Sequence, residues 1–231
     1  MAPRVLDLPR PIEAVLFDFH STLVDQGDPE AWLNLAWSHA GRQGSPRESL
    51  GQEGFERIAR WVNRMWEHVQ EVDPKSERDL SATRHREVYD TLMERVPDVD
   101  GKLSQALYEV MLETWIPYED ALPTLKELKR RGLKLALISN VALDVKGVLK
   151  RAGMAGLFDA VILSYEVGIV KPEAGIFERA LEALQVSPSQ ALMVGDNARD
   201  DGGAALLGIR TLLLPRTRGP VHGLEVVLRM I

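Results

Sequence analysis

The sequence predicts an α/β protein: a Rossmann-like, doubly wound parallel sheet of five strands, with an all-helical domain inserted after the first strand. Through residues 116–231, short apolar segments of strand length alternate with amphipathic segments of helix length. One further apolar segment lies near the N-terminus, and the chain between it and the next strand has only helical periodicity. Alternating strands and helices form parallel sheets with right-handed crossovers.

The first strand is expected at residues 14–18, extending to about residue 19. Its run Ala-Val-Leu-Phe is apolar at every position, as in a strand that is buried on both faces. Residues 1–12 contain three prolines and are expected to form an irregular surface segment. The strand ends at Asp18, a carboxylate at the point where a buried strand becomes a loop.

Residues 26–115 are predicted to form a separate domain of about four helices. Apolar residues recur there at intervals of three and four, and all five tryptophans lie in this span. Asp28-Pro29 is typical of a helix start, and Asp79 and Asp98 are further candidate N-caps. Residues 41–54, rich in Gly, Ser and Pro, predict a break between helices. The predicted domains are therefore a core of residues 1–25 and 116–231 and a cap of residues 26–115.

The remaining core elements alternate in type and are punctuated by glycine. Strands are expected at residues 133–139, 159–163, 191–195 and 210–214, and helices at 119–131, 145–152, 172–184, 202–207 and 224–231. Because the cap is inserted directly after Asp18, it is expected to hang over the strand ends as a lid, with hinges near residues 24–28 and 115–119.

Composition excludes several classes of function. The net charge is −6 and the basic residues are spread along the chain, which argues against nucleic-acid and membrane partners. Cysteine is absent, so disulfides, thiolate metal sites and cysteine nucleophiles are excluded. No apolar run of 18 residues or signal-like segment is present, so a cytoplasmic location is expected. None of these features predicts an oligomeric state.

Polar residues follow the apolar run at several strand ends. Each alone is explained as well by a helix cap, a turn or a solvated surface group. In an open parallel sheet, however, the carboxyl ends of the strands share one edge, where ligands bind. The residues expected to meet there are Asp18, Ser139, Asn140, Lys171, Asp196, Asp200 and Asp201.

This set of residues indicates phosphoryl transfer. Carboxylate oxygens from Asp18 and Asp196 suit a hard cation, above all Mg²⁺. A metal, a lysine and a carboxylate together position the phosphoryl group and neutralise its oxygens. A carboxylate can also be the nucleophile, forming an aspartyl-phosphate that water then hydrolyses.

The sequence resembles the haloacid dehalogenase (HAD) superfamily of hydrolases, specifically its phosphatase-like members with a helical cap of the C1 type. The resemblance covers essentially the whole chain. It rests on four motifs in order: Asp18-Phe-His-Ser-Thr-Leu23, Ile138-Ser139-Asn140, Val170-Lys171-Pro172 and Val194-Gly-Asp196-Asn-Ala-Arg-Asp200-Asp201.

The resemblance implies a role for each motif. Asp18 would be the nucleophile and a ligand of Mg²⁺, and the residue at position 20 would bind the metal through its main-chain carbonyl. Ser139, with Asn140, would bind the phosphoryl group, which Lys171 would neutralise. The second carboxylate ligand would be Asp196. Either Asp200 or Asp201 would bind a metal-bound water or hold Lys171, and the sequence leaves this choice open.

His20 departs from the family pattern, because most phosphatases of the family have Asp there as the acid/base. Histidine can perform both proton transfers, and its ordinary pKa of ~6.5 suits neutral pH. The alternative is that the ring only packs or points away, which would leave a slow enzyme. Histidine in place of aspartate is expected to impair proton transfer more than Mg²⁺ binding, because the metal contact uses the main-chain carbonyl.

Three functions compete. The first is a Mg²⁺-dependent phosphatase acting on a small phosphorylated metabolite. The second is a metal-independent 2-haloacid dehalogenase, because those relatives also lack Asp at position 20. The third is a non-catalytic binding protein that kept the pocket. Asp196 favours the first, since the dehalogenases have no acid there.

A helix of the cap carries Trp61 and three arginines, Arg57, Arg60 and Arg64, that share one face. These arginines would suit an anionic leaving group. The favoured interpretation is a solvated basic face with the tryptophan in the core of the cap, where Trp32 and Trp37 are also expected.

Overall fold

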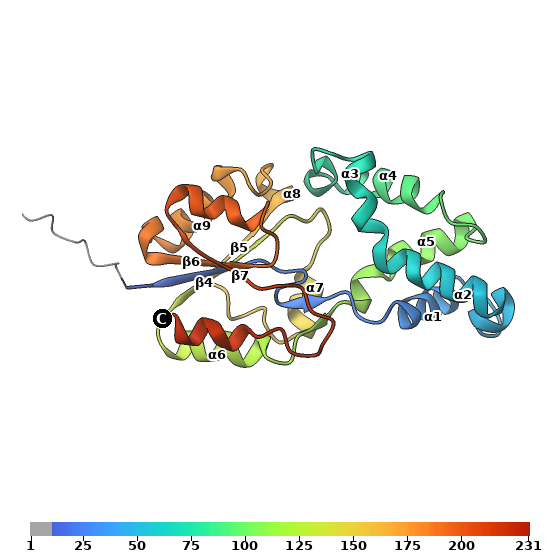
Figure 1. Cartoon of the computed structure of the whole chain (residues 1–231), viewed down its shortest axis with the longest axis horizontal. Coiled ribbons are helices and arrows are strands. Elements are labelled where there is room, and N and C mark those ends of the chain that lie inside the picture. The colour runs from blue at the N-terminus through green and yellow to red at the C-terminus, as the bar shows by residue number, and fades with distance from the viewer. Residues whose placement is uncertain (1–10) are drawn as a thin grey trace, which may run out of the picture.

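The computed structural model describes residues 11–231, and the centre of the fold is a five-stranded parallel sheet (Figure 1). The strand order β5-β4-β1-β6-β7 confirms the predicted α/β class. The strands are β1 (Ala14–Phe17), β4 (Lys134–Ser139), β5 (Ala160–Leu163), β6 (Ala191–Gly195) and β7 (Arg210–Leu213). Most of the expected N-terminal surface segment, residues 1–10, lies outside the described residues.

The central strand β1 is fully buried because helices cover both faces of the sheet. Val15 and Phe17 face one apolar cluster, and Ala14 and Leu16 face another. Each of the four is 0% exposed, which explains why the strand has no polar alternation. The first face packs on α6 (Ala121–Arg130) and α7 (Lys146–Arg151), and the second on α8 (Ser164–Val167) and α9 (Ala174–Leu184).

Two segments that were predicted as α-helices form 3₁₀ turns instead. They are η5 (Asp201–Leu207) and η6 (Leu224–Arg229). The first contains the adjacent glycines Gly202 and Gly203, which have low α-helix propensity. Gly203 also lies against Pro172, where an added Cβ would come within 2.6 Å of that ring.

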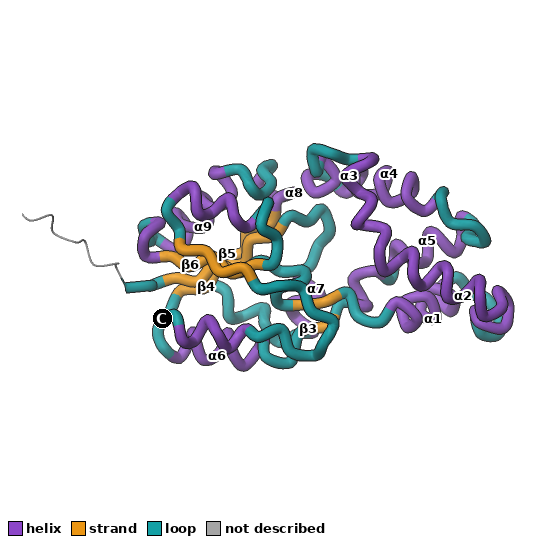
Figure 2. Tube along the Cα trace, in the orientation of Figure 1, coloured by secondary structure: helices purple, strands orange, loops and turns teal. Residues whose placement is uncertain are grey.

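The inserted helices gather at one side of the sheet and form their own apolar core (Figures 1 and 2). Trp32 and Trp37 are buried in that core, as predicted. The helices are α1 (Pro29–His39), α2 (Pro46–Arg64), α3 (Val69–Val72), α4 (Ala82–Met93) and α5 (Gly101–Glu109), joined in part by the turns η1 (Met65–His68), η2 (Glu77–Leu80) and η3 (Met111–Thr114).

Asp28 caps α1 with Pro29 at the first position, as predicted. The other two predicted caps are wrong, because Ser81 caps α4 and Asp100 caps α5. Asp79 instead lies inside η2 and is buried.

The predicted break at residues 41–54 is too long. Helix α2 already begins at Pro46, where Ser45 and Glu48 form a capping box, and it is only kinked at Gly51.

The chain leaves the sheet region and returns to it through a short antiparallel ribbon. β2 (Val24–Asp25) pairs with β3 (Ile116–Pro117), with Val24 opposite Pro117. The ribbon follows the loop after Asp18, so the helices are tethered beside the carboxyl ends of the strands. Among residues 11–231, no helix has the length and apolar character needed to cross a membrane.

Candidate active site

The polar residues at the strand ends line one cavity of about 490 Å³ between the sheet edge and the inserted helices. Asp18 follows the central strand, and the other predicted site residues reach the same cavity from the same loop and from three later segments. They are His20, Ser139, Asn140, Lys171, Asp196, Asp200 and Asp201. The structure therefore brings together every residue that the sequence placed at this edge.

Lys171 joins two carboxylates at the floor of the cavity. Its Nζ atom lies 2.6 Å from Oδ1 of Asp18 and 2.6 Å from Oδ1 of Asp201. All three side chains are buried, so the two charge-assisted hydrogen bonds are shielded from water.

The ion pairs decide the protonation of Lys171. Burial alone would lower the pKa of Lys171, but the attraction of Asp18 and Asp201 outweighs it and raises that pKa above the ordinary lysine value. Burial raises the pKa of Asp18, and Lys171 opposes that shift. The ammonium group of Lys171 thus favours the carboxylate form of Asp18, the form that a nucleophile needs.

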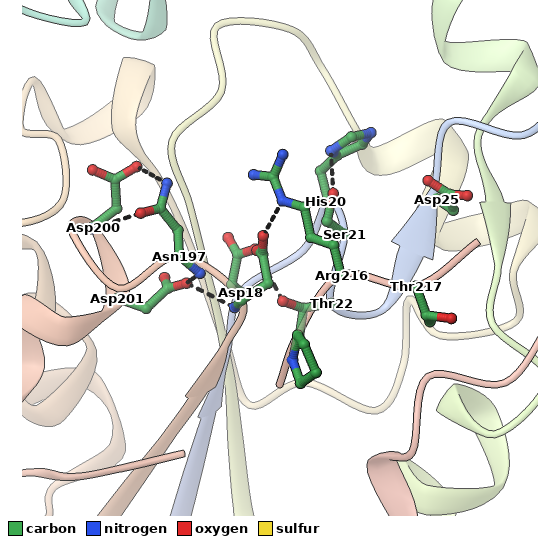
Figure 3. Close-up of polar contacts among 12 residues, drawn as sticks. Asp18, His20, Ser21, Thr22, Asp25, Asn197, Asp200, Asp201, Arg216 and Thr217 are labelled. Carbon is green, nitrogen blue, oxygen red and sulfur yellow. Dashed lines mark hydrogen bonds and ion pairs between the residues drawn. The ribbon is translucent and has the colours of Figure 1, made fainter. Parts of the chain in front are cut away.

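Asp201, and not Asp200, is the acid that holds Lys171. The second oxygen of Asp201, Oδ2, accepts hydrogen bonds from the main-chain N–H groups of Asp196 at 3.0 Å and Asn197 at 2.9 Å. Asp200 accepts from the side-chain amide of Asn197 instead, at 2.9 Å (Figure 3). Asp201 therefore fixes both the lysine and the loop that carries Asp196.

Gly195 makes the approach of Asp201 sterically feasible. A Cβ atom at this position would lie 2.1 Å from Oδ2 of Asp201, far inside van der Waals contact. The last residue of β6 must be glycine for this carboxylate to sit against the strand.

The side-chain amide of Asn140 contacts the main chain of Lys171. Its Oδ1 accepts a hydrogen bond from the main-chain N–H of Lys171 at 2.7 Å, and its Nδ2 donates to the carbonyl of the same residue at 2.9 Å. Both ends of the amide are used, so the side chain positions Lys171. Ser139, next to it, is buried and lines the cavity.

The site also has the donor set for a divalent cation. Carboxylate oxygens of Asp18, Asp196 and Asp201 all lie within 4.8 Å of one another. Each of the three acids also accepts hydrogen bonds: Asp201 through both oxygens, Asp18 from Lys171 and from Thr22 at 3.2 Å, and Asp196 from Arg216. An all-oxygen set of this kind fits Mg²⁺.

Arg216 was missed by the sequence analysis. It follows β7, and its Nε atom contacts Oδ2 of Asp196. In the view of Figure 3 its guanidinium group lies between Asp18 and the ring of His20. The only available signal was that this arginine comes shortly after the last strand of the same sheet edge. A cation bound by Asp196 would share this carboxylate with Arg216 or displace it.

His20 occupies a sheltered position in the cavity that Asp18 lines. Its ring packs against Trp115 with 4.6 Å between ring centroids, and its Nδ1 lies 3.2 Å from the hydroxyl oxygen of Ser21. Burial lowers the pKa of His20 to about 4, against the opposing effect of Asp25. The imidazole is therefore neutral at pH 7, and the ordinary histidine pKa assumed from the sequence does not apply.

The three cap arginines do not line the cavity. Each forms a surface ion pair: Arg57 with Asp98, Arg60 with Glu56 at 3.8 Å, and Arg64 with Glu67 at 2.8 Å. This confirms the interpretation as a solvated basic face. The charged side chains that the inserted helices and turns do present to the cavity include Glu67, Arg78 and Asp79.

Comparison with known proteins adds three findings. The profile of the haloacid dehalogenase-like hydrolase family matches residues 12–208. The chain is 44% identical over 105 residues to a phosphoserine phosphatase of Thermus thermophilus, covering 45% of this chain and 42% of that protein. It is 28% identical over 208 residues to an (S)-2-haloacid dehalogenase of Pseudomonas sp. strain YL, covering 89% of this chain and 84% of that protein.

Among solved structures, the fold is similar to that of a HAD phosphatase from Thermococcus onnurineus. The two have a TM-score of 0.61 and 24% identity, over 95% of this chain and 97% of the other. The phosphatase match in sequence spans less than half of that relative's length, whereas the dehalogenase match spans most of its own.

Proposed function

The chain belongs to the haloacid dehalogenase-like hydrolase family, and we propose that it is a Mg²⁺-dependent phosphomonoester hydrolase with Asp18 as its nucleophile. The observation that carries the proposal is the ion pair of Lys171 with Asp18, with Asp196 beside it. A buried ammonium next to the attacking carboxylate neutralises both the nucleophile and the incoming phosphoryl group. The carboxylate pair supplies ligands for a hard cation.

The reaction would proceed in two steps. An oxygen of Asp18 attacks phosphorus, the P–O bond to the leaving group breaks, and the leaving oxygen takes up a proton. Water then attacks phosphorus, the bond to Asp18 breaks, and inorganic phosphate leaves as the carboxylate is regenerated. Lys171 and Ser139 stabilise the phosphoryl oxygens in both steps.

Asp18, Asp196 and the main-chain carbonyl of His20 would hold Mg²⁺. When bound, Mg²⁺ would supply positive charge against the phosphoryl oxygens. The side chain of His20 is the candidate acid/base. Its ring is neutral at pH 7, so it can accept a proton from the attacking water, whereas the leaving oxygen would take its proton from solvent water.

The substrate would be a small phosphorylated metabolite. A cavity of about 490 Å³ has the size of a small-molecule site. Residues 26–115 would act as a cap that excludes water during the reaction. Two curated relatives are named as phosphatases of small metabolites, phosphoserine phosphatase and glyceraldehyde 3-phosphate phosphatase.

A second candidate is a 2-haloacid dehalogenase, which the nearly full-length match to such an enzyme favours. Position 20 lacks a carboxylate, and Arg216 neutralises Asp196. In this chemistry Asp18 attacks the carbon that carries the halogen, halide leaves, and water hydrolyses the resulting ester.

One experiment separates the candidates. Release of phosphate from p-nitrophenyl phosphate is measured with Mg²⁺ and with EDTA, and release of chloride from 2-chloropropionate is measured with EDTA. The proposal expects Mg²⁺-dependent phosphate release that Asp18→Asn abolishes and that Asp144→Asn, an exposed aspartate, retains. Chloride release in EDTA would establish the dehalogenase instead. Inactivity in both assays and on a wider panel of phosphate esters would indicate a binding protein that has lost turnover.

A further inference from the structure

This inference rests on the proposed function and concerns the chemistry of the substrate's leaving group, which the proposed function does not specify. The cap contributes one unusual residue to the cavity, Asp79 in the turn η2. Its side chain is only 6% exposed, although it lines the site. A buried carboxylate is costly unless it is paired or hydrogen-bonded, so its position calls for an explanation.

Asp79 is held in place from both sides of the cavity. Its main-chain carbonyl accepts a hydrogen bond from the hydroxyl group of Ser164 in the core, at 2.6 Å. Ser164 is fully buried, and its Oγ also accepts from the main-chain N–H of Val141, at 2.9 Å. Val141 follows the Ser139-Asn140 segment directly, so Asp79 has a defined place relative to the phosphoryl end of the cavity.

The carboxylate group itself is only partly compensated. Its Oδ2 forms an ion pair with Arg78 at 3.0 Å, and within residues 11–231 no group donates a hydrogen bond to its Oδ1. Burial raises the pKa of Asp79 to about 7, Arg78 opposes the shift, and Asp73 and Asp200 add to it. A hydrogen-bond donor from a ligand would relieve this cost.

Arg78 also lines the cavity, but two carboxylates share its charge, and its Nη1 is buried and has no hydrogen-bond partner among residues 11–231. It lies between two buried carboxylates, with Nη1 3.5 Å from Oδ2 of Asp73 and Nη2 3.0 Å from Asp79. The two acids neutralise its charge. The cap wall at this point therefore presents an acceptor, and a second anionic group on the substrate would meet Asp79.

We propose that Asp79 is a specificity-determining residue that accepts a hydrogen bond from a hydroxyl or ammonium group on the leaving group of the phosphomonoester. Esters with such a donor would be preferred over apolar esters of similar size, and esters with a carboxylate in this place would be disfavoured.

The test measures binding without turnover. Titration calorimetry of the Asp18→Asn protein with Mg²⁺, at pH 8.5 where Asp79 is ionised, compares glycerol 1-phosphate and ethanolamine phosphate with propyl phosphate and phosphoglycolate. At least one donor-bearing ester is expected to bind roughly 10-fold more tightly than propyl phosphate, the scale of one hydrogen bond to a charged group. Phosphoglycolate is expected to bind more weakly than propyl phosphate. Preference for glycerol 1-phosphate identifies a hydroxyl donor, and preference for ethanolamine phosphate an ammonium donor.

A second substitution assigns the preference to Asp79. Asp79→Asn, made in the Asp18→Asn protein, keeps the size of the side chain but removes its charge, and it is expected to abolish most of the preference. Glu77→Gln is the matched control, because Glu77 is exposed on the same turn, and it should leave the preference unchanged. If Asp79→Asn fails to fold, the comparison of esters in the Asp18→Asn protein still tests whether donor-bearing esters are preferred.

Equal binding of all four esters, tighter binding of phosphoglycolate, or an unchanged preference in Asp79→Asn would overturn the inference. Binding of none of the esters would overturn it too. In one further outcome, the wild-type protein releases no phosphate from any of these esters while the Asp18→Asn protein keeps the preference. That result would contradict the proposed phosphatase activity but would still support the assignment of Asp79.

Discussion

The Nζ atom of Lys171 lies 2.6 Å from Oδ1 of Asp18, although 153 positions separate the two residues in the chain. Lys171 lies in the loop between α8 and α9, whereas Asp18 follows the central strand β1. Asn140, which follows β4, holds the main chain of Lys171 through two hydrogen bonds, and Asp201 binds its ammonium group from the far side. The charge on the nucleophile is therefore set by a small buried network.

Replacement of Lys171 by methionine is expected to abolish activity and to destabilise the fold. Two buried carboxylates lose their partner, and breaking a buried pair in this way costs about 3–5 kcal/mol. Because burial raises the pKa values of Asp18 and Asp201, these acids bind protons more tightly in the folded variant than in the unfolded chain. The loss should thus be larger at pH 8 than at pH 4.5, measured by urea denaturation.

The control for this substitution is Lys129→Met, which breaks the ion pair of Lys129 with Asp159. That pair is partly exposed, so its loss should cost at most about 1 kcal/mol. A loss of stability, relative to the wild type, that is equal at both pH values would show that the two carboxylates are not buried as charges.

Gly195→Ala is expected to inactivate the protein. The new methyl group would overlap Oδ2 of Asp201, and the displaced carboxylate would release Lys171 and the loop that carries Asp196. Such overpacking typically costs about 1–3 kcal/mol. Gly202→Ala, seven residues further on, has no neighbouring atom within 4 Å and should leave both activity and melting temperature nearly unchanged. Equal effects of the two substitutions would contradict the steric account.

The pH dependence of kcat/KM tests the role of His20. With the pKa of His20 lowered to about 4 by burial, the neutral ring persists on acidification, and a nearby Mg²⁺ would lower that pKa further. If the neutral ring is the base, activity should stay level from pH 7 to about 5 and fall only as the pH approaches 4. His20→Asn should remove this fall in kcat/KM at low pH. A fall centred near pH 6.5 in the wild-type protein would instead indicate an exposed ring.

Arg216→Gln is expected to increase the affinity for Mg²⁺. The guanidinium group contacts the carboxylate that would bind the metal, and a positive charge there repels a second cation. Titration of Mg²⁺ followed by calorimetry should show a lower dissociation constant in the variant. Arg179→Gln, on an exposed face of α9, is the control. Weaker Mg²⁺ binding in Arg216→Gln would mean that the arginine holds Asp196 in the orientation that the metal needs.

Much of the fold was predictable because its signals are local. A run such as Val15 to Phe17 is apolar at every position only when both faces of a strand are covered. A glycine in the left-handed conformation often ends a helix, as Gly168 ends α8. Predictions of helix caps were wrong where the same residue type also suits another position, such as a turn. Asp79 has the residue type of an N-cap, but the chain places it in a buried turn, and Ser81 caps the following helix instead.

The sequence by itself determined the order of strands and helices, the inserted helical segment and the group of polar residues at one sheet edge. Only the tertiary structure decided that Asp201 rather than Asp200 holds Lys171, that Asn140 positions the lysine, and that Arg216 reaches Asp196. Local patterns encode which face of an element is apolar, since each residue contributes through its own burial. Which side chains meet depends on crossovers and loop paths that join positions more than a hundred residues apart, and no local pattern contains that information.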